Sequence, residues 1–312
     1  MFKMIYNIAR TELQMLFYSP VAWLILVVFG VQSGMLFADQ LAGLVSAQEM
    51  GYDIQGSTIS IFANRWGGVF TTMQNYLYFY IPLLTMSLVS KELSSGSIRL
   101  LYSSPITNTQ IIVGKFFSMM IYGLIMIGIL FLITLCSWAI VKDFELSMVL
   151  TGLLGLYLLI CAYAAIGIFM SSLTSYQIVA AIGTFAVLMV LSMVGGWWQD
   201  YDFIRDVTYW LSMPGRSGKF IAGLICSEDV LYFVIVVCLF LTLTIIRLNA
   251  VRQKIRFSIT LGRNVGVILL ACFLGYLSAL PTLMVYYDAT ETKMNTLTPN
   301  SQEIVAKLDG KV

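Results

Sequence analysis

The chain contains no histidine and carries little charge. Only 11% of its 312 residues are Asp, Glu, Lys or Arg, whereas 59% are hydrophobic. A typical soluble domain is about 25% charged, and a single water-soluble core cannot bury this much apolar surface. The composition therefore excludes an ordinary soluble protein and predicts an integral membrane protein.

The side chains and loops that catalysis needs are also missing. Without histidine, and with no carboxylate pair inside the apolar runs, metal-assisted hydrolysis and general acid–base catalysis have little support. No segment matches the GxxxxGK[ST] loop that holds nucleotide phosphates, because Gly114-Lys115 and Gly218-Lys219 lack the upstream glycine and the following Ser or Thr. We therefore predict that the chain is not an enzyme, binds no metal or cofactor itself, and is driven by another protein.

The five cysteines show no paired spacing, and four of them lie in apolar runs, where cysteine behaves as a small apolar residue. The sequence thus indicates neither a disulfide framework nor a zinc site. The N-terminus carries Arg10 and Glu12 and has no small-residue cleavage site, so we do not expect a cleavable signal peptide.

Seven charge-poor runs predict membrane-spanning helices. A helix needs about 20 residues to cross a hydrocarbon layer of about 30 Å, and a barrel would show short alternating segments instead. The predicted fold is therefore an all-α integral membrane protein. Its predicted spans are residues 20–38, 76–90, 116–141, 148–170, 178–194, 230–246 and 265–287.

The distribution of Lys and Arg predicts a cytoplasmic N-terminus and an external C-terminus, because cytoplasmic loops are enriched in basic residues. In that orientation the cytoplasmic segments contain only two acids, and their basic residues are Lys3, Arg10, Lys91, Arg99, Lys115, Arg247, Arg252, Lys254, Arg256 and Arg263. On the external side, acids outnumber bases. The basic run 247–263 is typical of a segment that sets topology and binds anionic lipid head groups; with a net charge of +2, nucleic acid is a poor alternative partner.

Residues 1–19 predict an amphipathic helix that lies on the membrane surface. Polar side chains, among them Arg10, share one sector of the helix, and apolar side chains share the opposite one. Glu12 breaks this pattern because it falls in the apolar sector. Its carboxylate either reaches back to the head groups or forms a fixed ion pair with a cytoplasmic cation, for which Arg99 and Lys91 are the nearest candidates.

Two external segments and the C-terminal region are predicted to carry their own structure. Residues 39–75 suggest short interfacial helices, and residues 195–229 a re-entrant or surface helix that caps the translocation path. Aromatic residues in the second segment, such as Trp197 and Trp210, are typical of an interfacial belt, with substrate contacts as the alternative. The polar region 288–312, with a short helix predicted at 301–308, is either a solvated tail or the start of an extracytoplasmic domain.

Residues 91–115, KELSSGSIRLLYSSPITNTQIIVGK, form a polar island between two apolar runs. We expect a short helix from Glu92 to Tyr102 along the inner surface, ended by Ser104-Pro105. Gly96 is expected to permit close backbone approach to a partner, with Arg99 projecting from the same side. The candidate residues for contact with that partner are Lys91, Glu92, Ser95, Gly96, Arg99 and Pro105, together with Arg10 and Glu12 on the N-terminal helix.

The polar island and several other stretches resemble the ABC-2-type permeases associated with gliding motility. The stretches are TELQMLFYSPVAW near the start, IPLLTM in the second predicted span, GLLGLYLLICAYAAIGIFMSSLTSYQIVA in the fourth predicted span and its exit, and GKFIAGLICSEDVLYF before the sixth. Together they cover most of residues 10–247. The chain departs from the family at Lys91-Glu92, where two acids are usual, and at Arg99, where an acid is usual. Residues 297–308 resemble the start of the companion extracytoplasmic subunit.

This resemblance implies a six-span permease bundle with an added seventh span. The implied domains are the interfacial helix 1–19, the permease domain 20–250, a basic loop with the seventh span at 251–287, and the start of an extracytoplasmic domain at 288–312. The implied partners are a dimer of ATPase subunits, which bind ATP and Mg²⁺, and a second permease copy. The implied activity is ATP-driven transport, expected to be export, across a bacterial inner membrane.

Two other functions stay open at this point. In a mechanotransmission complex, ATP hydrolysis would drive an extracytoplasmic partner and nothing would cross the bilayer. An ATP-independent carrier or channel would normally show ionisable groups near the membrane midplane or inverted repeats, and the sequence shows neither. The glycines and serines of the third to fifth spans indicate close helix packing more readily than a substrate site.

Overall fold

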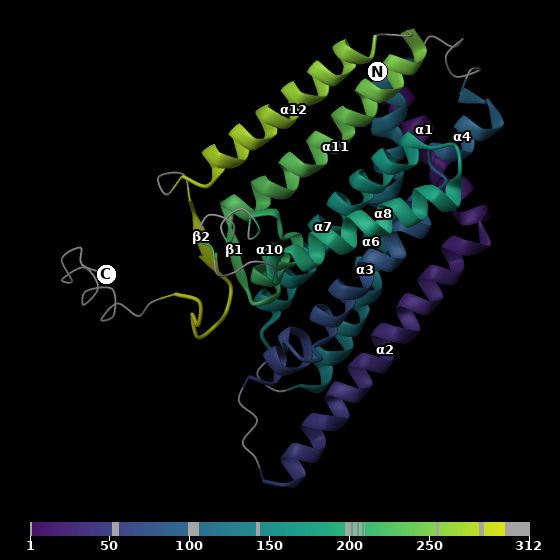
Figure 1. Cartoon of the computed structure of the whole chain (residues 1–312). Coiled ribbons are helices and arrows are strands. Elements are labelled where there is room, and N and C mark those ends of the chain that lie inside the picture. Colours follow the sequence, from purple (N-terminus) through teal and green to yellow (C-terminus); the bar gives the residue numbers. More distant parts are fainter. Residues whose placement is uncertain are drawn as a thin grey trace, which may run out of the picture.

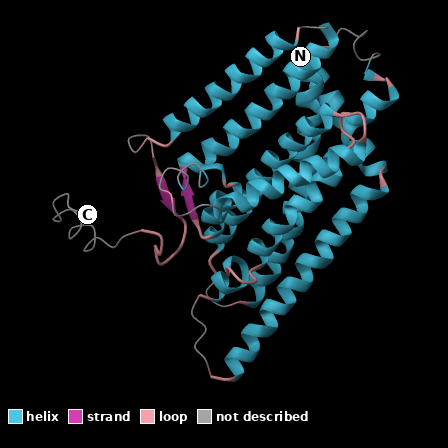
Figure 2. Ribbon diagram, in the orientation of Figure 1, coloured by secondary structure: helices cyan, strands magenta, loops and turns pink. Residues whose placement is uncertain are grey.

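Long apolar helices dominate the computed structural model (Figures 1 and 2), as the composition predicts. The structure describes residues 2–51, 56–98, 106–141, 144–196, 201, 205, 208, 210–253, 256–280 and 284–296. Within these residues, six helices are long and apolar enough to cross a membrane. They are α2 (Pro20–Glu49), α6 (Asn108–Ile140), α7 (Leu146–Leu173), α8 (Gln177–Met193), α11 (Ser227–Gln253) and α12 (Phe257–Ser278). The predicted all-α membrane fold is confirmed.

The second predicted span, residues 76–90, is part of α3 (Val69–Thr85). This helix has 17 residues, at the short end for a spanning helix, and it begins and ends earlier than predicted. Most of its side chains are buried against α7 and α8. The chain then turns through residues 86–89 before α4 (Ser90–Ser95) begins. The second predicted span is therefore a buried central helix followed by a break.

Other boundaries also differ from the prediction. The short interfacial helices predicted for residues 39–75 do not begin at residue 39, because α2 continues without a break to Glu49. In the predicted polar island, α6 begins at Asn108, where Thr107 and Gln110 form a reciprocal capping box. This cap starts the helix eight residues before the predicted span at residue 116. Similarly, α12 begins at Phe257, so the basic loop before it is shorter than predicted. Helix α12 ends at Ser278.

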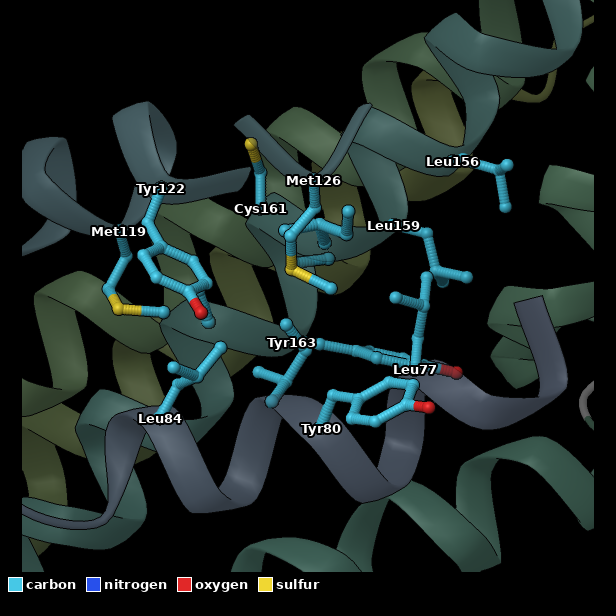
Figure 3. Close-up of a cluster of buried hydrophobic side chains, with 14 of the residues drawn as sticks. Leu77, Tyr80, Leu84, Met119, Tyr122, Met126, Leu156, Leu159, Cys161 and Tyr163 are labelled. Carbon is cyan, nitrogen blue, oxygen red and sulfur yellow. The ribbon is translucent and has the colours of Figure 1, made fainter. Parts of the chain in front are cut away.

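Helix α7 occupies the centre of the bundle, and glycines allow its neighbours to approach closely. A Cβ at Gly167 would collide with Thr85 Oγ1 on α3, and one at Gly155 would collide with Phe220. Apolar side chains of α3, α6 and α7 fill the space around α7 (Figure 3). This supports the prediction that the glycines of these spans serve helix packing.

The two ends of the bundle carry different elements (Figure 1). One end, called the α4 end here, contains α1 (Phe2–Tyr18), α4, the end of α11 and the beginning of α12. The opposite end, the α10 end, contains the π-helix Ile59–Ala63, the short helix α10 (Met213–Ile221) and the strands β1 (Leu224–Cys226) and β2 (Tyr286–Asp288). The described part of the external segment 195–229 thus includes the short helix predicted there.

Candidate functional site

Helix α1 packs closely against the start of α6 at Gly114. A Cβ at this glycine would lie 2.7 Å from Ile8 Cγ2, so only glycine permits this separation of the two helices. The side chains of α1 that are buried share one stripe: Ile5, Ala9, Glu12 and Leu16. Glu12 is the charged member of an otherwise apolar stripe, as the sequence predicts. The close approach brings its carboxylate to the residue that follows the glycine, Lys115.

Lys115 pairs with two carboxylates from two different helices. Its Nζ lies 2.5 Å from Glu12 Oε1 on α1 and 2.7 Å from Glu92 Oε1 on α4. The exposed fractions of the side chains are 2% for Lys115, 10% for Glu12 and 20% for Glu92. We call these three residues the charge triad. It joins α1, α4 and α6 at one buried point.

The charge triad contains two carboxyl groups and one ammonium group. Burial raises the pKa of the Glu92 carboxyl, the Lys115 ammonium opposes that rise, and the nearby Glu12 carboxylate adds to it. Removing charges from water is costly unless they are paired and hydrogen-bonded. The ion pairs of Lys115 therefore hold both glutamates, and their helices, at defined positions.

The predicted ion pair of Glu12 exists, but its partner is not the predicted Lys91, and the other candidate, Arg99, stays untested. Lys91 is exposed, and Arg99 lies outside the described residues; the partner is Lys115. Sequence reasoning placed Lys115 at the end of a surface segment, whereas the capping box at Thr107 puts it two turns inside α6. The signal that could have identified it is the Gly114-Lys115 pair, which combines close backbone approach with a cation.

Ser171 on α7 positions the beginning of α4. Its Oγ accepts hydrogen bonds from the backbone N–H groups of Val89 (3.1 Å) and Ser90 (3.0 Å), and it donates to the carbonyl of Met86 (2.9 Å). The first N–H groups of a helix lack intrahelical partners. This one hydroxyl therefore provides hydrogen-bond partners for backbone groups at the break between α3 and α4. From the sequence, Ser171 was predicted only to serve helix packing, because its hydrogen-bond partners are distant in the chain.

The helix α4 is shorter than predicted. It ends at Ser95, because Gly96 adopts a left-handed conformation with φ of 71°, which glycine tolerates best. Nothing in the described chain lies within 4 Å of the Cβ position of Gly96, so its expected close approach to a partner stays a prediction. Ser95 and Arg10 are exposed. Two of the predicted contact residues, Arg99 and Pro105, lie outside the described residues.

A second buried ion cluster lies at the α10 end. Arg216 of α10 is 1% exposed, and its Nη1 lies 2.9 Å from Glu228 Oε1 and 2.5 Å from Asp229 Oδ1 at the start of α11. The guanidinium also stacks 4.4 Å from the ring centroid of Tyr232, and Lys219 pairs with Asp229 at 3.2 Å. These contacts fix α10 to α11.

The chain after α12 packs beside the segment that joins α10 to α11. Strand β2 pairs antiparallel with β1, with Cys226 opposite Tyr286. Ala289 donates a backbone hydrogen bond to the Gly223 carbonyl (2.8 Å), and Asn295 donates to the Ala222 carbonyl (2.9 Å). We call residues 284–296 the C-terminal clamp.

Asp288 organises the turn of the C-terminal clamp. Burial opposes ionisation of this carboxyl, but hydrogen bonds from Thr290 and Asn295 together lower its pKa. The backbone N–H of Glu291 donates to Glu145 Oε2 (3.3 Å) at the start of α7. The C-terminal clamp therefore contacts both α10 and α7, which makes the beginning of region 288–312 a folded part of the bundle.

The architecture is that of a multi-pass membrane subunit with structurally distinct ends. The chain matches the family model described as ABC-2 family transporter protein over residues 6–199, and it therefore belongs to this family of ABC transporter membrane subunits. The matched range contains most of α1, the charge triad, Ser171 and α8. A comparison with individual curated proteins finds no match. Membership implies an ATPase partner chain and a dimeric permease.

Proposed function

We propose that this chain couples ATP hydrolysis, carried out by a separate ATPase subunit, to movement of its membrane helices for export of a substrate. The observation that carries the proposal is the charge triad, which joins α4 to α1 and α6 through one buried lysine. The ATPase would contact α4, and ATP with Mg²⁺ would be bound only by that partner. The basic residues predict that the α4 end faces the cytoplasm of a bacterial inner membrane, with the C-terminus outside.

The contacts of α4 define how its displacement would be transmitted. Ser171 connects its beginning to α7, and Glu92 connects its body to Lys115. A displacement of α4 would move α6 through Lys115 and α1 through Glu12. Helix α2 follows α1 after the single residue Ser19, so movement of α1 would tilt the first spanning helix. A push at one surface would thus reach several helices.

The second candidate function is force transmission to an extracytoplasmic partner or domain, with nothing crossing the bilayer. The C-terminal clamp favours this candidate, because it ties the segment after α12 to α10 and α7. Helix movements at the α10 end would then be passed to that segment. In both candidates, α4 receives the input from the ATPase.

Co-purification with the ATPase tests the proposal. A tagged full-length chain is purified from its own cells, and the P-loop-containing partner is identified by mass spectrometry. Gly96→Trp places a bulky group at the end of α4, where the described chain offers free space; the left-handed φ adds local strain, but we expect the protein to fold and to lose most of its ATPase. Gly51→Trp, at another open glycine with a left-handed φ after the end of α2, is the matched control and should retain it. Equal ATPase recovery from both variants would refute α4 as the contact.

A further inference from the structure

A cavity of about 450 Å³ lies beside the charge triad, and the proposed mechanism assigns it no role. Its wall includes side chains of α1, the first turn of α2, the end of α3, α4 and the beginning of α8. Sites for small molecules commonly measure about 300–1,000 Å³. The cavity is thus large enough for the head group of an amphiphile.

The wall of the cavity divides into an apolar part and a polar part. Met15, Val21 and Leu83 are apolar lining residues that are also exposed, with exposed fractions of 47%, 38% and 44%. Lys91 and Ser95, four residues apart on α4, line the polar part together with Ser97. Because residues spaced by four share one face of a helix, α4 presents an ammonium and a hydroxyl to the same space.

Two unbalanced charges of opposite sign face the cavity. Lys91 is exposed, and no carboxylate among the described residues forms an ion pair with it. The charge triad also lines the cavity and has two carboxylates for one ammonium, so it retains one negative charge. A ligand that matches this wall carries a negative group for Lys91, a hydrogen-bonding cation for the triad, and an apolar tail.

We propose that this cavity binds a zwitterionic, amine-bearing phospholipid of the inner leaflet, such as phosphatidylethanolamine. Its phosphate binds Lys91 and the Ser95 hydroxyl, its ammonium binds Glu92, and its acyl chains lie against Val21 and Leu83. Phosphatidylcholine carries the same charges but cannot donate hydrogen bonds from its trimethylated nitrogen. Phosphatidylglycerol carries no cation, so it leaves the charge of the triad unmatched. The proposal rests on the membrane family and the cavity, not on ATP coupling.

Native mass spectrometry of the purified full-length chain tests the proposal. The chain is titrated with phosphatidylethanolamine, phosphatidylcholine and phosphatidylglycerol in competition. We expect phosphatidylethanolamine to bind about tenfold or more tightly than either competitor, because one charge-assisted hydrogen bond accounts for such a difference. Equal affinities of the three lipids would overturn the proposal.

Substitutions assign the binding to this cavity. We expect Lys91→Gln to weaken phosphatidylethanolamine binding about tenfold and Lys91→Arg to restore it, whereas Lys3→Gln, the same charge change on exposed α1, has no effect. We expect Glu92→Gln to remove the preference for phosphatidylethanolamine over phosphatidylcholine. Thermal unfolding of each variant checks folding. Unchanged lipid affinity in folded Lys91→Gln, or coverage of the cavity by a second copy or by the ATPase in a structure of the complex, would refute the lipid site.

Discussion

At the scale of single residues, the one ammonium group of Lys115 forms ion pairs with two carboxylates on two helices. All three side chains are mostly removed from water, so each depends on the others for compensation of its charge. A buried ion pair contributes little against a well-packed apolar replacement, but removing one partner leaves the other buried and uncompensated. The geometry therefore makes Lys115 the most sensitive position of the charge triad.

Lys115→Met should lower the free energy of unfolding by about 3–5 kcal/mol, because Glu12 and Glu92 lose their shared cation. The matched control is Lys91→Met on exposed α4, which should change it by about 0.5 kcal/mol or less. Reversible unfolding in mixed detergent, followed by tryptophan fluorescence, measures both. Similar losses in the two variants would contradict the ion pairing of Lys115.

The raised pKa of Glu92 predicts a pH dependence of stability. As the pH rises above the ordinary carboxyl value of 4.5, the unfolded chain releases this proton before the folded chain does. The free energy of unfolding should therefore fall from about pH 4.5 through the raised pKa, and level off above it. Unfolding series across this range should show that Glu92→Gln reduces the slope, while Glu49→Gln, at the exposed end of α2, leaves it unchanged. An unchanged slope in Glu92→Gln would rule out its raised pKa as the cause.

At the scale of elements, α4 is too short to hold its own position. It has six residues, and isolated helices shorter than about 12–15 residues are marginal in water. Its place depends on Ser171 at its beginning and on Glu92 in its body. The same two contacts allow a displaced α4 to act on α7 and α6.

Ser171→Ala should leave backbone groups at the start of α4 without their hydrogen-bond partner. Three hydrogen bonds are lost, and unsatisfied buried backbone groups cost about 1–3 kcal/mol each. We expect faster hydrogen exchange at residues 88–95 and weaker coupling of ATP hydrolysis to substrate. Ser172→Ala is the control, because Ser172 Oγ donates only to Phe169 O of its own helix. Equal exchange at residues 88–95 in the two variants would show that Ser171 does not position α4.

Hydropathy predicted the type of the elements better than their number and their ends. The long apolar runs predict α6, α7, α8 and α11 because each contains enough apolar residues to span a membrane. The ends of α2 and α6 were missed because polar residues continue both helices beyond the apolar core, in α6 through a local cap at Thr107. The burial of Glu12 was predicted from helical periodicity. Its partner was not, because contacts such as those of Lys115 and Ser171 join residues far apart in the sequence.

At the scale of the whole molecule, the charge triad and the C-terminal clamp lie at opposite ends of one bundle (Figure 1). Helix α7 connects them, since Ser171 near one end contacts the α4 junction and Glu145 just before the other end contacts the C-terminal clamp. Tight glycine contacts along α7 favour its movement as one body. A displacement at α4 can therefore reach the segment after α12.

The strand register allows the C-terminal clamp to be locked. The hydrogen bonds at Gly223–Ala289 and Ser227–Val285 place Cys226 and Tyr286 in a non-hydrogen-bonded pair, whose side chains are close. In a chain with its other four cysteines replaced, Tyr286→Cys should form a disulfide with Cys226 on addition of an oxidant. The oxidant accepts the two electrons that disulfide formation releases, and the reaction should be slow at neutral pH because burial raises the pKa of Cys226 to about 11.

The control for this cross-link is Tyr287→Cys, whose side chain lies on the opposite face of the strand. Peptide mapping without reduction should find the disulfide only with Tyr286→Cys. Equal yields from the two variants would contradict the register. If the C-terminal clamp must move during the cycle, the disulfide should also slow substrate-coupled ATP hydrolysis, and reduction should restore it.

The most direct test of α4 as the ATPase contact is a cross-link from Ser94, which is exposed on α4 and does not line the cavity. In the intact transporter, with the natural cysteines replaced, Ser94→Cys is labelled with a short photoreactive thiol reagent in native membranes. We expect an adduct with the P-loop-containing chain, identified by mass spectrometry, and none from Thr296→Cys in the exposed part of the C-terminal clamp. An adduct from Thr296→Cys but not from Ser94→Cys, or labelling of Ser94→Cys by a membrane-impermeant reagent from outside, would contradict α4 as the contact.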